Sequence, residues 1–358
     1  NHIFMNKSSF GNHFTVTTWG ESHGKALGAV VDGCPAGLSL NEEDIQKFLD
    51  RRKPGQSRYT TARKEGDLVE ILSGVFEGKT TGTPISLIVR NTDQRSRDYG
   101  NIAYTYRPGH ADFTFDAKYG FRDYRGGGRS SGRETIGRVA AGAIAAKILE
   151  TLEISFYTYT KSIGPVKIES FDAEEISKNA FYMPDAKAAE AAGAYLEECM
   201  KNQDSAGGII ECRIKNVPAG LGNPVFEKLD AVLAEAVMSI GAVKAVEIGD
   251  GIQVSAMKGS EDNDGFHMEN GQITKNSNHA GGIMGGMSDG SEIILRAAVK
   301  PTPSISQPQN TVTDSGEETS LEIHGRHDPV IVPRAVVVVE SMCALAIVDT
   351  LFSNMTSQ

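Results

Sequence analysis

A glycine-rich loop that leads into an alanine-rich helix, at residues 125–148, is the segment that most constrains the fold. Three consecutive glycines at 126–128 precede two serines, and Ser131 and Glu134 have the Ser-x-x-Glu spacing of a helix capping box. We therefore predict a helix with Ser131 as its N-cap. The body of this helix carries small residues on several faces, so neighbouring elements can approach it closely and it is expected to be buried.

The same segment has the chemistry of an anion site. Arg129 and Arg133 are four residues apart, and Arg138 follows one turn later. Free backbone N–H groups at a helix N-terminus and nearby guanidinium groups both favour negative charge. The alternative, a flexible loop before an ordinary buried helix, remains open on this segment alone, because a lone glycine-rich loop is weak evidence.

The overall charge makes such an arginine cluster a local feature. The chain has 358 residues, with 36 Lys and Arg against 46 Asp and Glu, a net charge of −10. An acidic chain is a poor general binder of nucleic acid or anionic membranes. We found no run of 18 or more apolar residues, which predicts no membrane span, and we expect a cytoplasmic protein. The four cysteines are far apart without metal-ligand spacing, which predicts reduced, mostly buried thiols: Cys34, Cys199, Cys212 and Cys343.

Alternating and helical hydrophobic patterns predict a mixture of strands and helices. Strands are expected at 13–18, 26–32, 68–73, 84–90, 154–160, 208–214 and 292–299. Besides the central helix, helices are expected from Asn41 to a basic end at Arg51 and Arg52, at 185–202, from Asn223-Pro224 to Gly241, and at 340–352. The valine run 335–339 is ambiguous between strand and helix.

The domain organisation follows from what the sequence does not contain. Length alone allows two domains. No repeat of 20–50 residues and no low-complexity linker divides the chain, which favours a single domain over 5–358. Residues 1–4, before Met5, are interpreted as a remnant ahead of the native start.

The segment 91–125 shows little regular pattern but is rich in charged and aromatic residues. Long irregular segments of this kind are usually functional or disordered, and the aromatic content favours order. We expect 91–126 and 301–327 to become ordered when a ligand binds.

Three histidines lie in turns beside arginine, serine or carboxylate: His23, His110 and His327. Histidine is suited to proton transfer near neutral pH, although a single histidine in a turn is more often structural. A second glycine-rich stretch, 281–290, precedes Lys300, and its spacing fits neither a Walker loop nor a Rossmann fingerprint. The residues alone therefore indicate an enzyme that binds a phosphate and carboxylate substrate through arginines and transfers a proton.

Seven motifs, in order along nearly the whole chain, resemble those of the chorismate synthase family. They are Gly20-Glu21-Ser22-His23-Gly24, Asp50-Arg51-Arg52, Arg107-Pro108-Gly109-His110-Ala111-Asp112, Arg129-Ser130-Ser131-Gly132-Arg133-Glu134-Thr135, Asn278-His279-Ala280-Gly281-Gly282, Lys300-Pro301-Thr302 and Gly325-Arg326-His327-Asp328-Pro329. The resemblance implies an α+β fold, with a helical layer sandwiched between antiparallel β-sheets, usually assembled as a homotetramer. It also implies conversion of 5-enolpyruvylshikimate 3-phosphate to chorismate and phosphate, a 1,4-anti elimination that requires reduced FMN without net redox change.

The resemblance also implies roles for individual residues. His23 resembles the acid for the departing phosphate, His110 the residue that protonates reduced flavin, and Asp328 the carboxylate that helps remove the C6 proton. The substrate-binding set is Ser22, Arg52, Arg58, Arg107, Arg133 and Arg326. The FMN-binding set is Arg129, Ser130, Ser131, Gly241, Ala242, Gly285, Lys300, Pro301, Thr302, Pro303, Ser304 and Arg326. No metal site is expected.

Three positions depart from the family pattern. Gly241 stands where many relatives have an amide side chain, Gly132 where alanine is usual, and Pro303 where serine is common. Only backbone contact to FMN is possible at Gly241, so its effect on FMN affinity stays open.

The chain shows neither a nicotinamide domain nor long insertions, which favours the monofunctional type with an external flavin-reducing system. Two alternatives remain: an NADPH:flavin oxidoreductase, and a flavin-binding scaffold without chemistry.

Overall fold

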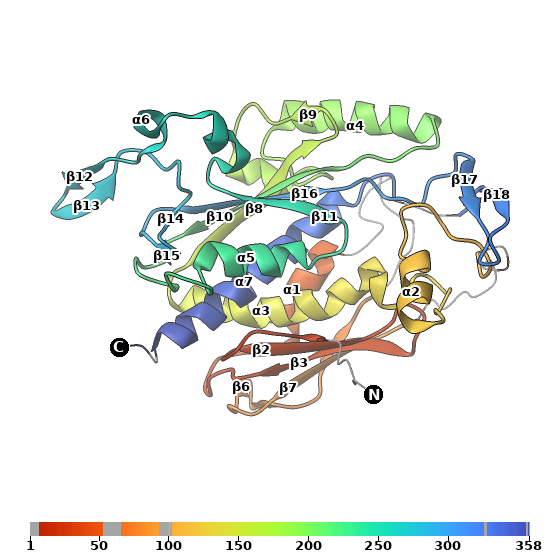
Figure 1. Cartoon of the computed structure of the whole chain (residues 1–358). Coiled ribbons are helices and arrows are strands. Elements are labelled where there is room, and N and C mark those ends of the chain that lie inside the picture. Colours follow the sequence, from red (N-terminus) through yellow and green to blue (C-terminus); the bar gives the residue numbers. More distant parts are fainter. Residues whose placement is uncertain are drawn as a thin grey trace.

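Three layers make up the computed structural model, which describes residues 7–52, 66–92, 100, 102–325, 328–355 and 357. A layer of helices lies between two five-stranded antiparallel sheets (Figure 1). In sheet order, the first contains β1 (Ser9–Phe10), β2 (Thr15–Gly20), β3 (Ala26–Asp32), β7 (Ile85–Arg90) and β4 (Val69–Ile71). The second contains β11 (Val243–Ile248), β16 (Ile293–Val299), β10 (Gly208–Lys215), β8 (Ser155–Ile163) and β9 (Val166–Lys167). The predicted α+β sandwich and all seven predicted strands are confirmed.

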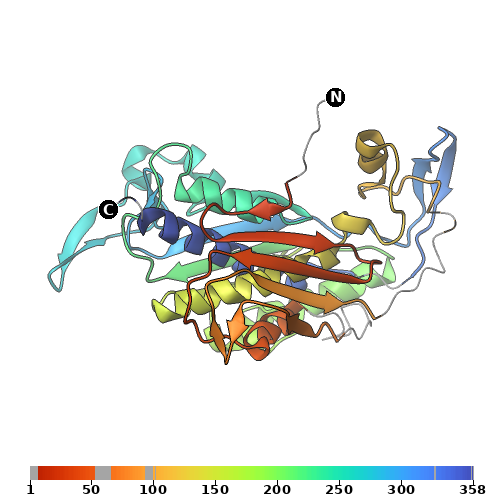
Figure 2. The same ribbon diagram turned by 90° about the horizontal axis from the view of Figure 1, so that it is seen from below.

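The helical layer is built mainly from α1 (Glu42–Arg52), α3 (Thr135–Thr151), α5 (Leu229–Met238) and α7 (Val332–Met355). Helix α3 contacts β2, β3 and β7 of the first sheet, whereas α7 contacts β8 and β10 of the second. Figure 2 shows the first sheet from below, with strands crossing in front of α3. Helix α4 (Ala186–Lys201) packs against β9.

The small residues of α3 allow the close approaches expected of it. A Cβ at Gly137 would lie 2.9 Å from the carbonyl oxygen of Gly28 on β3. A Cβ at Gly142 would lie 2.7 Å from the Oγ of Ser341 on α7. Any side chain at these two positions would push α3 away from a neighbouring element. Glycine therefore allows the short distances from α3 to β3 and from α3 to α7.

Helix α7 resolves the ambiguous valine run as part of one 24-residue helix. By length and composition alone it could cross a membrane, but Arg334, Glu340 and Asp349 interrupt it, so it contains no run of 18 consecutive apolar residues. Moreover, 83% of its most apolar window is buried inside the protein, as in the core helix of a folded domain. Its polar Asp349 is also buried, and one carboxylate oxygen accepts the backbone N–H groups of Asn12, His13 and Phe14 at 2.7–3.0 Å.

Two other predictions need correction. The segment 91–125 contains a regular helix, α2 (Asp112–Tyr119). The helix expected from Pro224 begins only at Leu229. The segment before it instead lies against the hairpin of β14 (Ile283–Met284) and β15 (Met287–Ser288), where Gly222 forms an antiparallel bridge with Met287. The N–H of Leu229 also donates to the carbonyl of Gly286 in this hairpin, at 2.8 Å.

The remaining elements are short. They are the hairpins β5 (Val75–Phe76) with β6 (Lys79–Thr80), β12 (Phe266–Glu269) with β13 (Gln272–Lys275), and β17 (Gln309–Val312) with β18 (Glu318–Leu321), and helix α6 (Gly259–Asp262). Helix α2 and the β17–β18 hairpin lie at one end of the molecule, and the β12–β13 hairpin projects at the other (Figures 1 and 2). The β17–β18 hairpin gives regular structure to part of 301–327, the segment expected to become ordered when a ligand binds. All four cysteines are free and buried, as predicted.

Candidate active site

Two arginines of the predicted substrate set share one buried carboxylate. Arg52, at the end of α1, donates from Nη1 to Oδ2 of Asp67 at 3.3 Å, and Arg133 donates to Oδ1 of the same side chain at 3.3 Å. The Asp67 side chain is only 2% exposed. Arg133 also donates to the amide oxygen of Asn91 at 2.7 Å. The result is a fixed pair of guanidinium groups ahead of α3.

The other donors of Arg52 anchor it to the start of α3. Its Nε donates to Thr135 Oγ1 at 2.7 Å and its Nη2 to the carbonyl of Gly132 at 3.1 Å. Burial lowers the pKa of Arg52 to about 9, helped by the neighbouring Arg334 and Arg133, while Asp67 acts in the opposite direction. The guanidinium is therefore still charged at neutral pH. Arg52 is 2% exposed, so it lies in the wall of the site.

Asp328, a predicted catalytic residue, joins this group through the first turn of α7. Nη1 of Arg334 donates to Asp328 at 2.7 Å, and its Nε donates to the backbone carbonyl of Arg52 at 3.1 Å. Asp328 is buried. Segments that are distant in sequence, the ends of α1 and the starts of α3 and α7, thus meet through hydrogen bonds.

The predicted phosphate acid, His23, lies against the glycine-rich loop. Its Nδ1 is 3.1 Å from Ser22 Oγ, and Ser22 in turn donates to the carbonyl of Gly126 at 3.3 Å. Gly126 has a φ of +63°, and a Cβ there would overlap the His23 ring and approach Ser22 Oγ to 2.9 Å. Glycine at this position is needed both for the backbone conformation and for the close approach to His23.

The predicted capping box at the start of α3 is only partly present. Ser131 does cap, but it accepts from the N–H of Arg133 and caps a 3₁₀ turn over Gly132–Glu134, ahead of α3. Glu134 instead pairs with Arg138 at 2.9 Å, because the turn delays the α-helix to Thr135. Arg138 therefore supports α3 and does not extend the anion site.

Two other members of the predicted FMN set on this loop bond to the protein backbone. Arg129 donates to Gly20 and Thr18 carbonyls at 3.2 and 3.3 Å, and Ser130 donates to Gly127 at 2.6 Å. Arg129 therefore closes the end of β2, and its contact with FMN stays a prediction.

The second predicted proton-transfer residue, His110, lies in a separate cluster. Its Nε2 is 2.8 Å from Ser304 Oγ, and Lys300 donates to the carbonyl of Gly109 at 2.8 Å. The backbone N–H of Lys300 donates to the carbonyl of Ala242. Burial lowers the pKa of His110 to about 4, helped by Arg107 and Lys300. Two distant parts of the predicted flavin set, Ala242 and residues 300–304, thus lie together beside the turn that carries His110.

Arg107, in the substrate set, is tightly paired. It donates to both carboxylate oxygens of Asp112 at 2.9 Å, and both side chains are buried. Burial opposes ionisation of Asp112, but its bonds to Arg107 hold the pKa below the ordinary value. The pair fixes the 107–110 turn at the start of α2.

The residues present fit a flavin nucleotide. The hydroxyl of Thr302 is buried and has no hydrogen-bond partner, an orphaned group within the predicted FMN set. A Cβ at Gly241 would meet nothing within 4 Å, and one at Gly285 only the methyl of Met287 at 3.8 Å. Space for a ligand near the backbone therefore exists at both glycines. Pro303 packs against Gly109, and Pro301 against Gly207.

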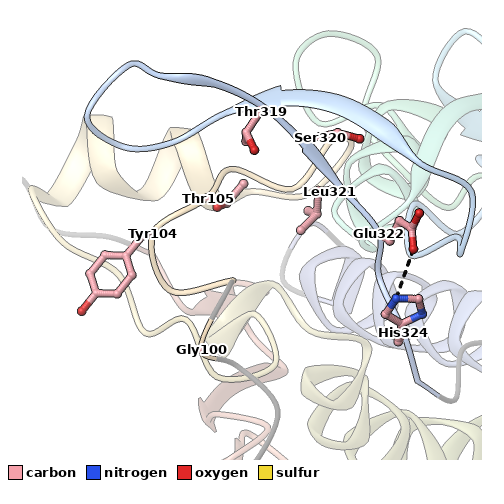
Figure 3. A pocket seen from close by; sticks show the side chains of 8 residues that line it. All are labelled: Gly100, Tyr104, Thr105, Thr319, Ser320, Leu321, Glu322 and His324. Carbon is pink, nitrogen blue, oxygen red and sulfur yellow. Dashed lines mark ion pairs between the residues drawn. The ribbon is translucent and has the colours of Figure 1, made fainter.

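A polar pocket of about 620 Å³ lies between Tyr104 and Thr105 on one side and strand β18 on the other. Figure 3 shows its lining, including Tyr104, Thr319 and the Glu322–His324 ion pair at 3.3 Å. None of the predicted site residues that the structure describes lines it. We assign the site by its charged clusters, because the described lining of this pocket includes no lysine or arginine.

Arg58, Arg326 and His327 lie outside the described residues, so their roles stay predictions. Sequence reasoning missed Asp67, Asn91 and Arg334, which lie outside the motifs. No metal-ligating cluster is found among the described residues.

Comparisons with known proteins agree with this picture. The family described as "Chorismate synthase" matches residues 14–352. The chain is 65% identical to a chorismate synthase from Agathobacter rectalis, covering 98% of this chain and 96% of that one. It is 56% identical to one from Methanocella arvoryzae, covering 98% and 95%. A solved structure titled "Crystal Structure of Chorismate Synthase" superposes with a TM-score of 0.78 at 32% identity, covering 96% of this chain and 93% of that one. The resemblance drawn from the seven motifs is confirmed: the chain belongs to the chorismate synthase family, enzymes of the shikimate pathway.

Proposed function

We propose that the protein converts 5-enolpyruvylshikimate 3-phosphate to chorismate and phosphate by 1,4-anti elimination, with reduced FMN and no net redox change. The observation that carries the proposal is the joined array of Arg52, Arg133 and Arg334 around Asp67 and Asp328. Among the described residues of this array, three guanidinium groups face two carboxylates, which favours a local positive charge inside a protein of net charge −10. Such a preorganised field would stabilise a substrate that carries a phosphate and two carboxylates, and the phosphate as it departs.

The arginines bind and orient the substrate. Arg133 is 11% exposed, and its guanidinium already donates to Asn91 and Asp67, so we expect it to act on the substrate mainly through its charge, as Arg52 does from the wall. His23 and Ser22 would hold the leaving phosphate, with His23 supplying its proton. Arg107, Arg58 and Arg326 complete the proposed substrate set.

The loop-borne cluster would hold FMN. The proposed binding set consists of residues 300–304, Gly241, Ala242, Gly285, Arg129, Ser130 and Ser131. Arg326 is shared between cofactor and substrate in this proposal. Reduced FMN, when bound, supplies electron density to the allylic system as phosphate leaves. An external system would reduce it, and we propose a cytoplasmic homotetramer of single-domain chains.

Besides His23, two groups of this chain move protons in the proposal. The carboxylate of Asp328, which pairs with Arg334, would help to remove the proton from C6. His110 is neutral at pH 7 with a pKa of about 4. A bound anion would raise that pKa, so ligand binding itself prepares His110 to hold a proton.

An anaerobic assay tests the proposal. Protein, chemically reduced FMN and 5-enolpyruvylshikimate 3-phosphate should yield chorismate absorbance and inorganic phosphate in equal amounts. His110→Ala and Asp328→Ala should lose turnover by at least about 100-fold while still binding FMN. Absence of product from the wild-type protein would refute the proposal, and near-wild-type rates would remove the substituted residue from the chemistry.

One further measurement separates the alternatives. Aerobic NADPH oxidation with FMN above a no-enzyme control would favour the NADPH:flavin oxidoreductase. Binding of FMN without any turnover would favour the scaffold.

A further inference from the structure

We propose that Asp67 is a positioning residue, which holds Arg52 and Arg133 in the geometry that binds the substrate's anionic groups. This inference rests on the proposed function. Asp67 belongs to none of the seven motifs, and the reaction has no chemical step for it.

The carboxylate of Asp67 is divided between two cations. Its Oδ2 accepts from Arg52 and its Oδ1 from Arg133, each at 3.3 Å. Both partners come from other elements, 15 residues before it and 66 residues after it. With 2% of its side chain exposed, Asp67 has no contact with bulk water that could weaken these interactions. One carboxylate therefore fixes the spacing between two guanidinium groups that would otherwise repel each other.

The backbone of Asp67 is itself held rigidly. Gln46 of α1 donates from its amide nitrogen to the carbonyl of Asp67 at 3.1 Å, and its amide oxygen accepts from the N–H of Val69 at 3.0 Å. Asp67 has a φ of +42°, in the left-handed region that aspartate and asparagine adopt more readily than most residues. A second layer of contacts thus aims the carboxylate, as a preorganised site requires.

Charge and geometry predict opposite effects of removing this carboxylate. If Asp67 acted only as a nearby negative charge, its neutralisation would strengthen anion binding. If it positions the arginines, its neutralisation weakens binding, because a misplacement of about 1 Å can cost about 100-fold. The sign of the change therefore separates the two roles.

Asp67→Asn is the decisive variant, since it keeps the shape and tolerates the left-handed backbone while removing the charge. Glu211→Gln is the matched control. Glu211 is also a buried carboxylate shared by two cations, Lys161 at 3.1 Å and Arg296 at 3.2 Å, but it lies on β10. Loss of a shared buried charge is common to both variants, and only Asp67→Asn touches the proposed substrate arginines.

Two measurements are made on the full-length protein. Steady-state kinetics with reduced FMN under anaerobic conditions give KM and kcat, and calorimetry with oxidised FMN present gives the affinity for 5-enolpyruvylshikimate 3-phosphate. For Asp67→Asn we expect KM to rise at least 10-fold and affinity to fall by a similar factor, with a smaller change in kcat and unchanged FMN binding. Glu211→Gln should leave KM, kcat, substrate affinity and FMN affinity within about twofold of the wild-type values.

A double variant tests whether Asp67 acts through Arg133, and a general loss of protein stability would not change the result. Residues that act as one unit are non-additive. In the Arg133→Ala protein, Asp67→Asn should therefore raise the logarithm of the substrate Kd by less than half as much as Asp67→Asn does in the wild-type protein.

The outcomes distinguish this inference from the proposed function. Unchanged or tighter substrate binding by Asp67→Asn, or full additivity with Arg133→Ala, overturns the positioning role and leaves the function standing. Wild-type protein that binds the substrate without forming chorismate refutes the function, while weaker binding by Asp67→Asn still supports the positioning role. Wild-type protein that neither binds nor converts the substrate refutes both.

Discussion

The two halves of the candidate site are built in different ways. One half rests on helix ends: Arg52 closes α1, Arg133 precedes α3 and Arg334 begins α7, and buried carboxylates link them. The other half rests on loops, where the turn containing His110 lies against the segment 300–304. The helix-borne half is preorganised by ion pairs among its own residues. The loop-borne half instead contains a neutral histidine and the orphaned hydroxyl of Thr302.

This difference suggests that the two halves bind different ligands. A cluster of fixed cations is suited to a highly charged substrate, because it requires no reorganisation when charge moves. A loop cluster with neutral and unsatisfied groups is suited to a ligand that completes it. The comparison predicts that the helix-borne half stabilises the fold strongly, and that the loop-borne half contributes less and depends on pH.

The largest effect is expected from breaking the helix-borne half at Arg52. Arg52→Met keeps much of the side-chain volume but leaves Asp67 buried beside a single remaining cation. Removing one partner of a buried pair typically costs about 3–5 kcal/mol of unfolding free energy. Urea denaturation followed by circular dichroism measures the loss.

Arg90→Met is the control for Arg52→Met, since Arg90 pairs with Glu70 while both side chains are 50% or more exposed. A surface pair of this kind contributes about 0–1 kcal/mol. Equal losses for the two variants would show that the Arg52 pair is no stronger than a surface contact.

A smaller effect, on activity, is expected at the loop that carries His23. Gly126→Ala would place a methyl group against the His23 ring and impose strain at a φ of +63°. We expect turnover to fall about 100-fold through displacement of His23. Gly132→Ala, six residues later, meets nothing within 4 Å and should keep near-wild-type turnover. If both variants are equally active under anaerobic assay, the packing of Gly126 on His23 has no catalytic importance.

Much of the fold could be predicted because it depends on local patterns. The strand at 26–32 appears with the predicted bounds, since alternation and flanking turns define it. The start of α5 could not be predicted in this way. Asn223-Pro224 is a good local start signal, but pairing of that segment with the β14–β15 hairpin takes precedence. Helix α7 likewise contains a valine run whose strand propensity is overridden by burial between the sheets.

The site shows the same limit. Motifs point to His23, His110, Arg133 and Asp328 as candidates, because their local context is distinctive. They did not indicate Asp67 or Arg334, whose importance arises only when elements far apart in sequence come together. The capping box was misread for a related reason: Glu134 has the right spacing, but the 3₁₀ turn directs it to Arg138.

The smallest effect is expected in the loop-borne half, and it depends on pH. The folded protein holds the pKa of His110 at about 4, below the ordinary value of 6.5, mainly through burial. As pH falls below about 6.5, the unfolded chain takes up a proton that the folded protein does not, so stability decreases until about pH 4. Between pH 7.5 and 5, the wild-type protein should therefore lose about 2 kcal/mol more unfolding free energy than His110→Gln, which cannot titrate. Urea denaturation of both proteins across this range measures the difference. Parallel pH profiles would mean that His110 titrates normally, and the loop-borne half would then be as well solvated as the surface.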